Sequence, residues 1–428
     1  MKVFKKSGAV AALVAITLIA GACGGSAKAV DMVFFGGITA TGAPLVRSQM
    51  TAAGLGDLAF MGGDGIVDGN SPESYIGTAG ASAANSYGSV AGINEELIPD
   101  AEGFSAKFKA EFDHAPGAYA ASAYACTQVL LTAISKAAAA GEVTRETIRA
   151  AAVDPAASYA TVLGTVSFDA VGDTTQKIIS LYNVVDGNWA FTDQVNTGED
   201  ATGGDLPTYG DATAGKTLKI GISLPLSGAS LASSGPARDG ALLAISEANK
   251  LGGVGGYKFE AVIKDHTGPD GSHAPDIAAA DMTALVADEA VVGVVGPFNS
   301  ASAKAQIPVS NEAGLFQCSP SNTNTSLTKG ADGETLRAAN PDKINYVRLC
   351  ATDDLQGAAL AAYAYTTLGL RSALVIDDTE TYGKGLADVF ATEFAALGGT
   401  VVGREAAAKT TTDYSAILSK YVPVTASK

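Results

Sequence analysis

The chain has 428 residues, of which 28 are Lys or Arg and 44 are Asp or Glu, so its formal net charge is -16. Apolar residues make up 47% and charged residues 17%, which excludes a disordered acidic protein and allows real hydrophobic cores. No basic stripe offsets the negative charge, and this argues against nucleic-acid binding. Four cysteines exclude a fold held by a disulfide framework, and the length predicts two or three domains.

The N-terminus has the parts of a secretory signal. Lysines among the first six residues precede an apolar run at 9–20 and small residues ahead of Cys23. The segment resembles a bacterial lipoprotein signal with residues 20–23 as the lipobox, which implies cleavage before Cys23 and lipidation of its thiol. The alternative is an ordinary secretory signal with a chance cysteine. No later stretch reaches the ~18 apolar residues of a transmembrane helix.

From Thr217 onward, short β-rich runs alternate with helical windows. The pattern predicts strands at 218–226, 257–265, 290–296, 314–320, 372–378 and 400–406, and helices at 237–250, 274–288, 300–314, 353–369, 382–399 and 413–420. Repeated strand-helix-strand units predict parallel sheets covered by helices on both faces. The alternation ends on its last helix without a closing strand.

The first half of the chain begins with a buried-type strand that has no helix before it. Predicted strands lie at 30–37, 58–65 and 161–169, and predicted helices at 42–55, 104–112, 119–141 and 145–152. Residues 177–185 and 188–191 read as a hairpin around Asp186 and Gly187. Residues 195–216 are rich in Gly, Thr and Asp, which is typical of a flexible acidic linker.

The motifs LKIGISLPLSG, VVGVVGPFNSASAKAQIPV, GLFQCSPSNTNTSLT and DDTETYGKGLADVF occur in this order after Thr217. They resemble the first part of the type I periplasmic solute-binding proteins, the branched-chain amino acid receptors of ABC importers. Residues 31–191 resemble the rest of the same family through VFFGG and LAFMGGDG. The family's second part therefore comes first, which predicts a circular permutation with residues 195–216 joining the old ends. The alternative is a fragment misassembled from a tandem gene or a faulty gene model.

The resemblance implies an α/β fold of two doubly wound, Rossmann-like lobes, joined by three crossovers, with the ligand cleft between them. The rule that ligands bind beyond the carboxyl ends of parallel strands points to the same place. The implied organisation is a signal peptide at 1–22, a tether at 23–30, lobe 2 at 31–90, lobe 1 at 91–175, a lobe 2 hairpin at 176–194, the linker at 195–216, lobe 1 again at 217–349 and lobe 2 again at 350–428.

In lobe 1 the resemblance implies three ligand-binding residues. Ser300 opens a helix directly after a strand, where free amides and the positive helix end would face a carboxylate. Its alternative role is that of an N-cap serine. Ser321 and Thr323 stand where the family presents a backbone group and a hydroxyl to the ligand, although both residues also fit a turn closed by their own side chains.

In lobe 2 the resemblance implies that Asp64 pairs with the ligand's α-ammonium, because a carboxylate in a closed cleft selects a cation. Tyr382 stands where a family tyrosine contacts the ligand, and a core tyrosine is the alternative. Ile38 is expected to line the side-chain pocket at a position that is often aromatic in the family. Ser233 or Ser234 stands at another such position, and these departures put leucine-like specificity in doubt.

The three histidines are His114, His266 and His273. His266 and His273 could form a metal cluster with Asp265 and Asp270. Their spacing follows a strand end and a Gly-Pro-Asp-Gly turn, however, which favours a solvated loop. We therefore expect no metal ion and no cofactor.

Cys318 and Cys350 both fall on predicted strands of lobe 1. In an oxidising compartment they either form a disulfide or remain two buried thiols. Cys126 lies on an apolar helix and is expected to contribute packing alone.

The leading hypothesis is a lipid-anchored receptor on the outer face of the membrane or in the periplasm. It would capture an amino acid or similar zwitterion by lobe closure and deliver it to an ABC permease. The alternative is a non-transporting sensor or interaction protein of the cell envelope. The sequence contains no G-x-S-x-G, Walker or H-E-x-x-H motif, so we expect no enzyme. A monomer is expected, and a dimer that exchanges strand 31–35 is the alternative.

Overall fold

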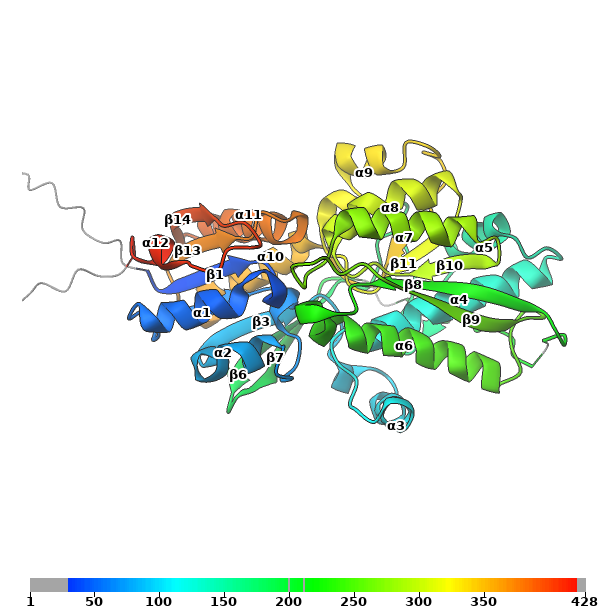
Figure 1. Cartoon of the computed structure of the whole chain (residues 1–428), viewed down its shortest axis with the longest axis horizontal. Helices are drawn as coiled ribbons and strands as arrows, with labels where there is room; N and C mark the ends of the chain where they lie inside the picture. The colour runs from blue at the N-terminus through cyan, green and yellow to red at the C-terminus, as the bar shows by residue number, and fades with distance from the viewer. Residues whose placement is uncertain (1–29, 199–200, 211, 422–428) are drawn as a thin grey trace, which may run out of the picture.

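The computed structural model describes residues 30–198, 201–210 and 212–421, and its strands form two large sheets that lie side by side along the molecule (Figure 1). Lobe 1 has a five-stranded sheet in the order β12-β11-β10-β8-β9. Lobe 2 has a seven-stranded sheet in the order β14-β13-β1-β2-β3-β6-β7. Helices cover both faces of each sheet, so the predicted α/β class with two doubly wound lobes is confirmed.

The strands of the lobe 1 sheet all come from the second half of the chain. They are β8 (Thr217–Leu224), β9 (Lys258–Asp265), β10 (Val291–Val295), β11 (Phe316–Ser319) and β12 (Tyr346–Arg348). Every neighbouring pair is parallel. The central strand β10 is buried throughout, which agrees with its continuous run of Val and Gly.

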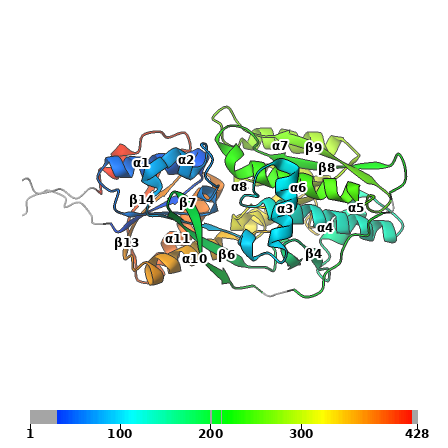
Figure 2. The ribbon, with the colours of Figure 1, turned by 90° about the horizontal axis from the view of Figure 1, so that it is seen from below.

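The helices of lobe 1 come from both halves of the chain. On one face lie α7 (Pro275–Ala287) and α8 (Ser300–Glu312). On the other face lie α4 (Ala120–Ala139), α5 (Arg145–Ala152) and α6 (Leu231–Lys250) (Figures 1 and 2). Two further helices, α3 (Ala101–Phe112) and α9 (Gly330–Leu336), contact α6 and α8. The first half therefore supplies part of the helical cover for a sheet whose strands all come from the second half.

In lobe 2, a strand from the beginning of the chain lies between two strands that are far away in sequence. Strand β1 (Met32–Gly36) pairs in parallel with β13 (Ser372–Asp377) on one side and with β2 (Ala59–Gly62) on the other. The sheet continues outward through β14 (Thr400–Ala406) at one edge and through β3 (Ser86–Val90), β6 (Ile178–Val185) and β7 (Asn188–Asn196) at the other. Strand β1 thus fills the place that the C-terminal alternation leaves open.

The helices of lobe 2 cover the two faces of β1. On one face lie α1 (Ala43–Ala52), α2 (Tyr75–Ala79) and α12 (Ser415–Leu418), and on the other α10 (Asp353–Ala362) and α11 (Thr381–Ala396). Neighbouring strand residues point to opposite faces. Phe34 stacks on Phe390 of α11 at a ring distance of 3.9 Å, whereas Phe35 meets Tyr414 at 6.5 Å. The side chains on both faces of β1 are therefore shielded from water.

Three local features differ from or refine the sequence predictions. Residues 161–169 do not form one strand, because β4 (Tyr159–Thr161) and β5 (Gly164–Val166) make a small antiparallel hairpin. The hairpin of β6 and β7 turns at Asp186 and Gly187, and both have the positive φ of a type I′ turn. The last predicted helix shortens to the four residues of α12.

The segment predicted as a flexible linker lies along lobe 1 where the structure describes it. Asp205 forms an ion pair with Lys136 of α4 at 2.5 Å, and the Thr208 amide donates to the Ser135 hydroxyl at 3.0 Å. The described chain passes between the lobes after β3, after β5, after β12 and again through this segment, from β7 to β8. The linker therefore adds a connection to the three crossovers that the resemblance implies.

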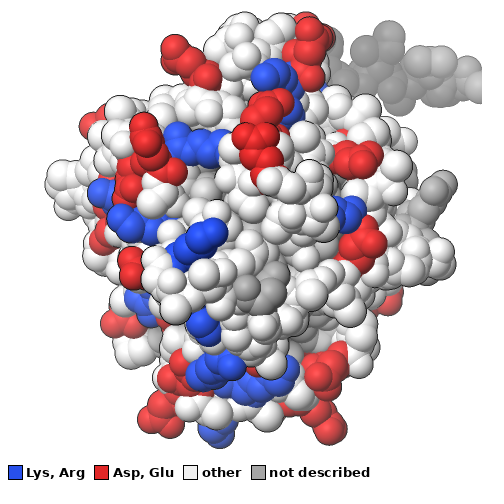
Figure 3. All heavy atoms as spheres, turned by 90° about the vertical axis from the view of Figure 1, so that its right-hand side faces the viewer, with Lys and Arg blue, Asp and Glu red and all other residues white. Residues whose placement is uncertain are grey.

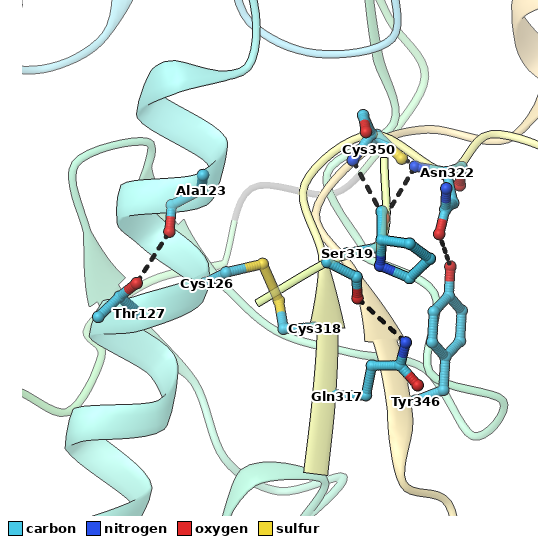
Figure 4. The surroundings of a disulfide bond; sticks show 12 residues. Ala123, Cys126, Thr127, Gln317, Cys318, Ser319, Asn322, Tyr346 and Cys350 are labelled. Atoms are coloured by element: carbon cyan, nitrogen blue, oxygen red, sulfur yellow. Dashed lines mark hydrogen bonds between the residues drawn. A yellow bond between two sulfur atoms is a disulfide. The ribbon is translucent and has the colours of Figure 1, made fainter. Parts of the chain in front are cut away.

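The cysteine pairing predicted from the sequence is wrong. Cys318 forms a disulfide with Cys126, with a Cα–Cα distance of 5.6 Å, and Cys350 is a buried free thiol. Helix α4 lies over the sheet beside β11, and this places Cys126 next to Cys318 (Figure 4). Cys350 lies beyond the end of β12, where its Sγ donates to the Asn322 carbonyl at 3.1 Å. Cys126 therefore does more than pack, and it links the two halves of the chain.

The part of the chain that the structure describes contains no helix that is long and apolar enough to cross a membrane. At the far end of lobe 1, basic side chains lie beside acidic ones (Figure 3). Pairs such as Lys219–Asp288 and Lys343–Glu146 account for part of this pattern. That face offers no continuous basic stripe of the kind that nucleic-acid backbones require.

The disulfide joins residues that are 192 positions apart in sequence, so its loss frees a long loop in the unfolded chain. Replacing Cys126 and Cys318 together by Ser should lower the free energy of unfolding by about 2–4 kcal/mol in a urea titration. The Cys350→Ser variant is the control, because it leaves the bond intact. Non-reducing peptide mapping that links Cys318 to Cys350 would contradict the pairing.

Candidate functional site

The residues predicted to bind the ligand lie at the carboxyl ends of strands, where the two lobes meet. Ser300 follows β10, Ser321 and Thr323 follow β11, and on the other lobe Ile38 follows β1, Asp64 follows β2 and Tyr382 follows β13. The lobes touch at this level, since the Asn324 amide donates to the Thr381 carbonyl at 2.7 Å and the Asp353 amide donates to the Thr323 carbonyl at 2.8 Å. The structure thus places all six predicted residues at one interface.

Asp64 is the centre of a buried hydrogen-bond network. Its Oδ1 accepts from the Tyr382 hydroxyl at 2.8 Å and from Gln356 Nε2 at 2.7 Å. Its Oδ2 accepts from the Tyr119 hydroxyl at 3.0 Å. Burial raises the pKa of Asp64 to about 6, against the lowering effect of the Tyr382 and Tyr119 hydroxyls. Tyr119 and Gln356, which the sequence analysis did not select, therefore hold this carboxylate in place.

The lobe 1 side presents hydroxyl and amide groups. The N-cap of α8 is Asn299, and Ser300 is the first helical residue, so the alternative role of Ser300 as the N-cap is wrong. The Ser321 hydroxyl donates to the Phe298 carbonyl at 2.9 Å. In contrast, the Thr323 hydroxyl and Asn299 Oδ1 are buried and have no partner among the described residues. A buried polar group without a partner is costly, so these two atoms mark places for ligand groups.

Asp353 is a second acid at this interface that the sequence analysis did not select. Its side chain belongs to the first turn of α10 and the residue is only 2% exposed. Neither carboxylate oxygen has a hydrogen-bond partner among the described residues. Burial and the charge of Asp64 hold the pKa of Asp353 well above its ordinary value. From the sequence, Asp353 and the more exposed Asp354 both read as ordinary acids at a helix start.

Two of the cavities that both lobes line are next to the predicted residues. One of about 460 Å³ is lined by Asp353 and by Asn324, Thr381, Lys304 and Lys384 from both lobes. A much smaller one is lined by Ile38 and Gly65 of lobe 2 and by Ser233, Phe298 and Asn299 of lobe 1.

The smaller cavity shows which of Ser233 and Ser234 faces the predicted side-chain pocket. Ser233 lines it, whereas the Ser234 hydroxyl turns inward to the Ser230 carbonyl at 2.9 Å. Phe298 supplies an aromatic ring, which packs edge-on against Tyr119 at 5.8 Å. An aromatic wall is therefore present although Ile38 and Ser233 are not aromatic.

The loop with Asp265, His266, Asp270 and His273 is solvated only in part, because Asp265 and Asp270 are exposed whereas the two histidines are not. His266 and His273 are both buried, and burial lowers the pKa of His266 to about 3, so its ring is neutral. No group of three or more His, Cys, Asp or Glu residues within the described ranges could hold a metal ion. The His266 ring contacts the Ser223 hydroxyl at 3.1 Å, but both residues are completely buried.

This same loop of lobe 1 reaches across to lobe 2. His273 Nε2 lies 3.4 Å from a carboxylate oxygen of Glu380. Lys409 Nζ lies 3.2 Å from Asp270 and donates to the His273 carbonyl at 3.0 Å. Glu380 and Lys409 follow β13 and β14, so these contacts connect the rims of the two lobes. They hold the lobes together beside the candidate site.

The family of periplasmic binding proteins matches residues 217–422. This part of the chain is similar to that family. The match covers the five strands of lobe 1 and the part of lobe 2 from α10 to α12. It therefore includes Ser300, Ser321, Thr323, Asp353 and Tyr382.

Two relatives have names that refer to amino acids. The amino acid binding protein of Pseudomonas aeruginosa is 30% identical over 202 residues, which are 47% of this chain and 50% of that protein. The Leu/Ile/Val-binding protein BraC3 of Rhizobium johnstonii is 32% identical over 206 residues, which are 47% of this chain and 51% of that protein. The chain thus spans about half the length of the curated relatives it matches.

Among solved structures, the branched-chain amino acid transporter substrate binding protein LivJ of Streptococcus pneumoniae, in complex with isoleucine, is 32% identical with a TM-score of 0.41. The similarity covers 48% of this chain and 53% of that one. The leucine binding protein LivK of Thermotoga maritima is 27% identical with a TM-score of 0.38, over 47% of this chain and 52% of that one.

The raised pKa of Asp64 predicts a dependence of stability on pH. Between its ordinary value near ~4 and about 6, the folded protein holds a proton that the unfolded chain has released. The contribution of Asp64 to stability should therefore fall as the pH rises through this window and change little above it. Asp64→Asn should make the fall shallower by about 2 kcal/mol, measured as unfolding free energies between pH 4 and pH 7.

The exposed hairpin variant Asp186→Asn is the control for this pH series. Buried Asp68 and Asp378, each with a pKa that burial raises to about 7, keep their own share of the slope in both variants. An Asp64→Asn profile as steep as that of the unchanged protein would show that Asp64 is not desolvated in solution.

Proposed function

We propose that the protein is the substrate-binding receptor of an ABC importer and that it captures an amino acid between its two lobes. The observation that carries the proposal is the buried carboxylate of Asp64 from one lobe, brought to the same interface as the unpartnered Thr323 hydroxyl and Asn299 amide oxygen of the other. An amino acid has an ammonium group, a carboxylate and a side chain. Its site therefore needs an acceptor for the cation, donors for the anion and a pocket for the side chain. The amino acid names of two relatives agree with this proposal.

In this proposal each lobe binds a different part of the ligand. Its carboxylate binds at the N-terminus of α8, where Ser300 lies in the first turn and the helix dipole is positive. Its ammonium binds to Asp64, and the aliphatic part of its side chain packs against Ile38 and Phe298. Tyr382 positions Asp64 through their shared hydrogen bond. Ser321 acts through its backbone, because its hydroxyl is already bonded to Phe298.

Ligand capture would favour the closed arrangement of the lobes. Each lobe supplies only some of the ligand's partners, so the ligand binds the closed state better than the open one and shifts the population toward it. The contacts of Glu380 and Lys409 with the loop around His273 add interactions that only the closed arrangement makes. Solute binding rather than catalysis also agrees with the complete burial of the Ser223–His266 pair, which no substrate can reach.

The proposed receptor works outside the cytoplasm, held at the membrane by a lipid on Cys23, and hands its ligand to a permease. The N-terminal pattern around Cys23 supports this part, although that residue lies outside the described range. The described chain begins at Val30, next to β1 of lobe 2, so the anchor would be attached to lobe 2.

The order of the chain supports a circular permutation. The matched family segment, residues 217–422, ends after α12, and the strand that pairs with β13 next in the sheet is β1. If β1 is placed after α12, the chain begins at β8 and ends at β7, and the order of strands and helices is that of the family resemblance described above. Residues 197–216 then correspond to the junction of the old ends.

Isothermal titration with the twenty common L-amino acids tests the proposed ligand class. At least one should bind with measurable heat, and Asp64→Ala should weaken that binding by at least about ten-fold, because it leaves the ammonium without a partner. Asp186→Asn should bind as the unchanged protein does. The absence of heat and of a thermal shift with every amino acid would contradict the proposal, and mass spectrometry of released ligand then identifies what the protein carries.

A rearranged chain tests the permutation. Residues 217–421 would be placed ahead of residues 30–196, with a short Gly/Ser linker joining 421 to 30. Because the contacts of both sheets are kept, its ligand affinity should match that of the natural order. Its thermal midpoint should be slightly lower, because the contacts of residues 197–216 with lobe 1 are lost. A rearranged chain that is unfolded, or a natural chain that is dimeric in light scattering while the rearranged chain is monomeric, would contradict a simple permutation within one molecule.

A further inference from the structure

We propose that Asp353 is a second anionic partner of the ligand's ammonium group, and that the site therefore selects a primary ammonium that donates three hydrogen bonds. This inference rests on the proposed function and names the chemical class that the site prefers. It assigns to Asp353 a binding role in a place where the resemblance implies only Asp64.

The hydrogen-bond inventory of the two acids is the first argument. An ionised carboxylate accepts about four hydrogen bonds. Asp64 already accepts from Tyr119, Tyr382 and Gln356. Asp353 accepts none among the described residues, although it is only 2% exposed. The acid with the open acceptor positions is thus Asp353, while most positions of Asp64 are occupied.

The charge around Asp353 is the second argument. The guanidinium of Arg348 is buried nearby, but it directs its donors elsewhere. Its Nε pairs with Asp173 at 2.7 Å, and its other nitrogens donate to the carbonyls of Asn322 and Asn324 and to the Thr328 hydroxyl. Lys329 pairs with Asp173 and Asp354. Among the described residues, no ion pair therefore neutralises Asp353, and a bound cation would.

The geometry of the loop is the third argument. The Asp353 amide donates to the Thr323 carbonyl at 2.8 Å, so the acid sits beside a residue whose hydroxyl also lacks a partner. Asp353 and the loop after Thr323, through Asn324, line the same interface cavity of about 460 Å³. A primary ammonium has three N–H donors, and Asp64, Asp353 and Thr323 offer three acceptors. A secondary amine or a trimethylated ammonium cannot satisfy all three.

Asp64 and Asp353 also affect the closing of the two lobes. Without a ligand, the closed interface removes the carboxyl groups of Asp64 and Asp353 from water, and this raises the free energy of the closed state. An ammonium between them removes that cost. The same residue should therefore oppose closure in the empty protein and favour it in the loaded protein.

The test compares Asp353→Asn with Asp354→Asn, which changes the neighbouring and more exposed acid. Titration with L-isoleucine and with N-methyl-L-isoleucine measures both the affinity and the preference for a primary ammonium. We expect Asp353→Asn to lose at least about ten-fold in affinity for isoleucine and to lose most of the preference over the N-methyl compound. Asp354→Asn should change both by less than about two-fold. Equal affinity and equal preference in Asp353→Asn would overturn the proposal.

A second measurement needs no ligand and separates this inference from the proposed function. Small-angle scattering of the empty proteins should give a smaller radius of gyration for Asp353→Asn than for Asp354→Asn and the unchanged chain, because closure then buries a neutral amide in place of a carboxyl group. If no amino acid binds to the unchanged protein, the proposed function fails while this measurement still tests Asp353. An unchanged radius of gyration in Asp353→Asn would then overturn its role.

Discussion

The parallel pairing of β1 with β13 and β2 is the constraint on which the rest of lobe 2 depends. Residues 32–36 lie in the interior of the sheet, and their partners on the neighbouring strands begin at residues 59 and 373. Asp64 follows β2 and Tyr382 follows β13, so the bond between their side chains spans the end of β1. The alternation of Phe34 and Phe35 fixes the register, because a shift by one residue would exchange the rings that face α11 and Tyr414.

The periodic patterns were sufficient to predict most strands and helices of both halves. Buried parallel strands such as β10 are short, continuous apolar runs, and the helices between them carry apolar residues at helical spacing. Errors occurred where local sequence is ambiguous. Residues 161–169 contain a glycine with positive φ at Gly164 that divides one expected strand into two. The linker has a polar composition, yet Asp205 and Thr208 bind to α4, which only the folded surface of lobe 1 reveals.

The site residues that directly follow predicted strands could be predicted from the sequence. Residues that follow parallel strands must meet at one edge, and this brings Asp64, Ser300, Thr323 and Tyr382 to the interface. Tyr119, Gln356 and Asp353 lie at or near helix starts, where polar residues are common and no local signal distinguishes a buried side chain from an exposed one. The disulfide of Cys126 could not be predicted from the sequence for a related reason, because it depends on which helix lies over β11.

The bond between Cys126 and Cys318 connects the two sides of the linker by a second covalent route. A protease that cuts the chain between Asn196 and Thr217 would produce two fragments that the disulfide still joins. The two pieces would remain joined under oxidising conditions and would separate covalently only on reduction. This segment can therefore be cut while β1 keeps its place in the sheet and both lobes keep their sides of the interface.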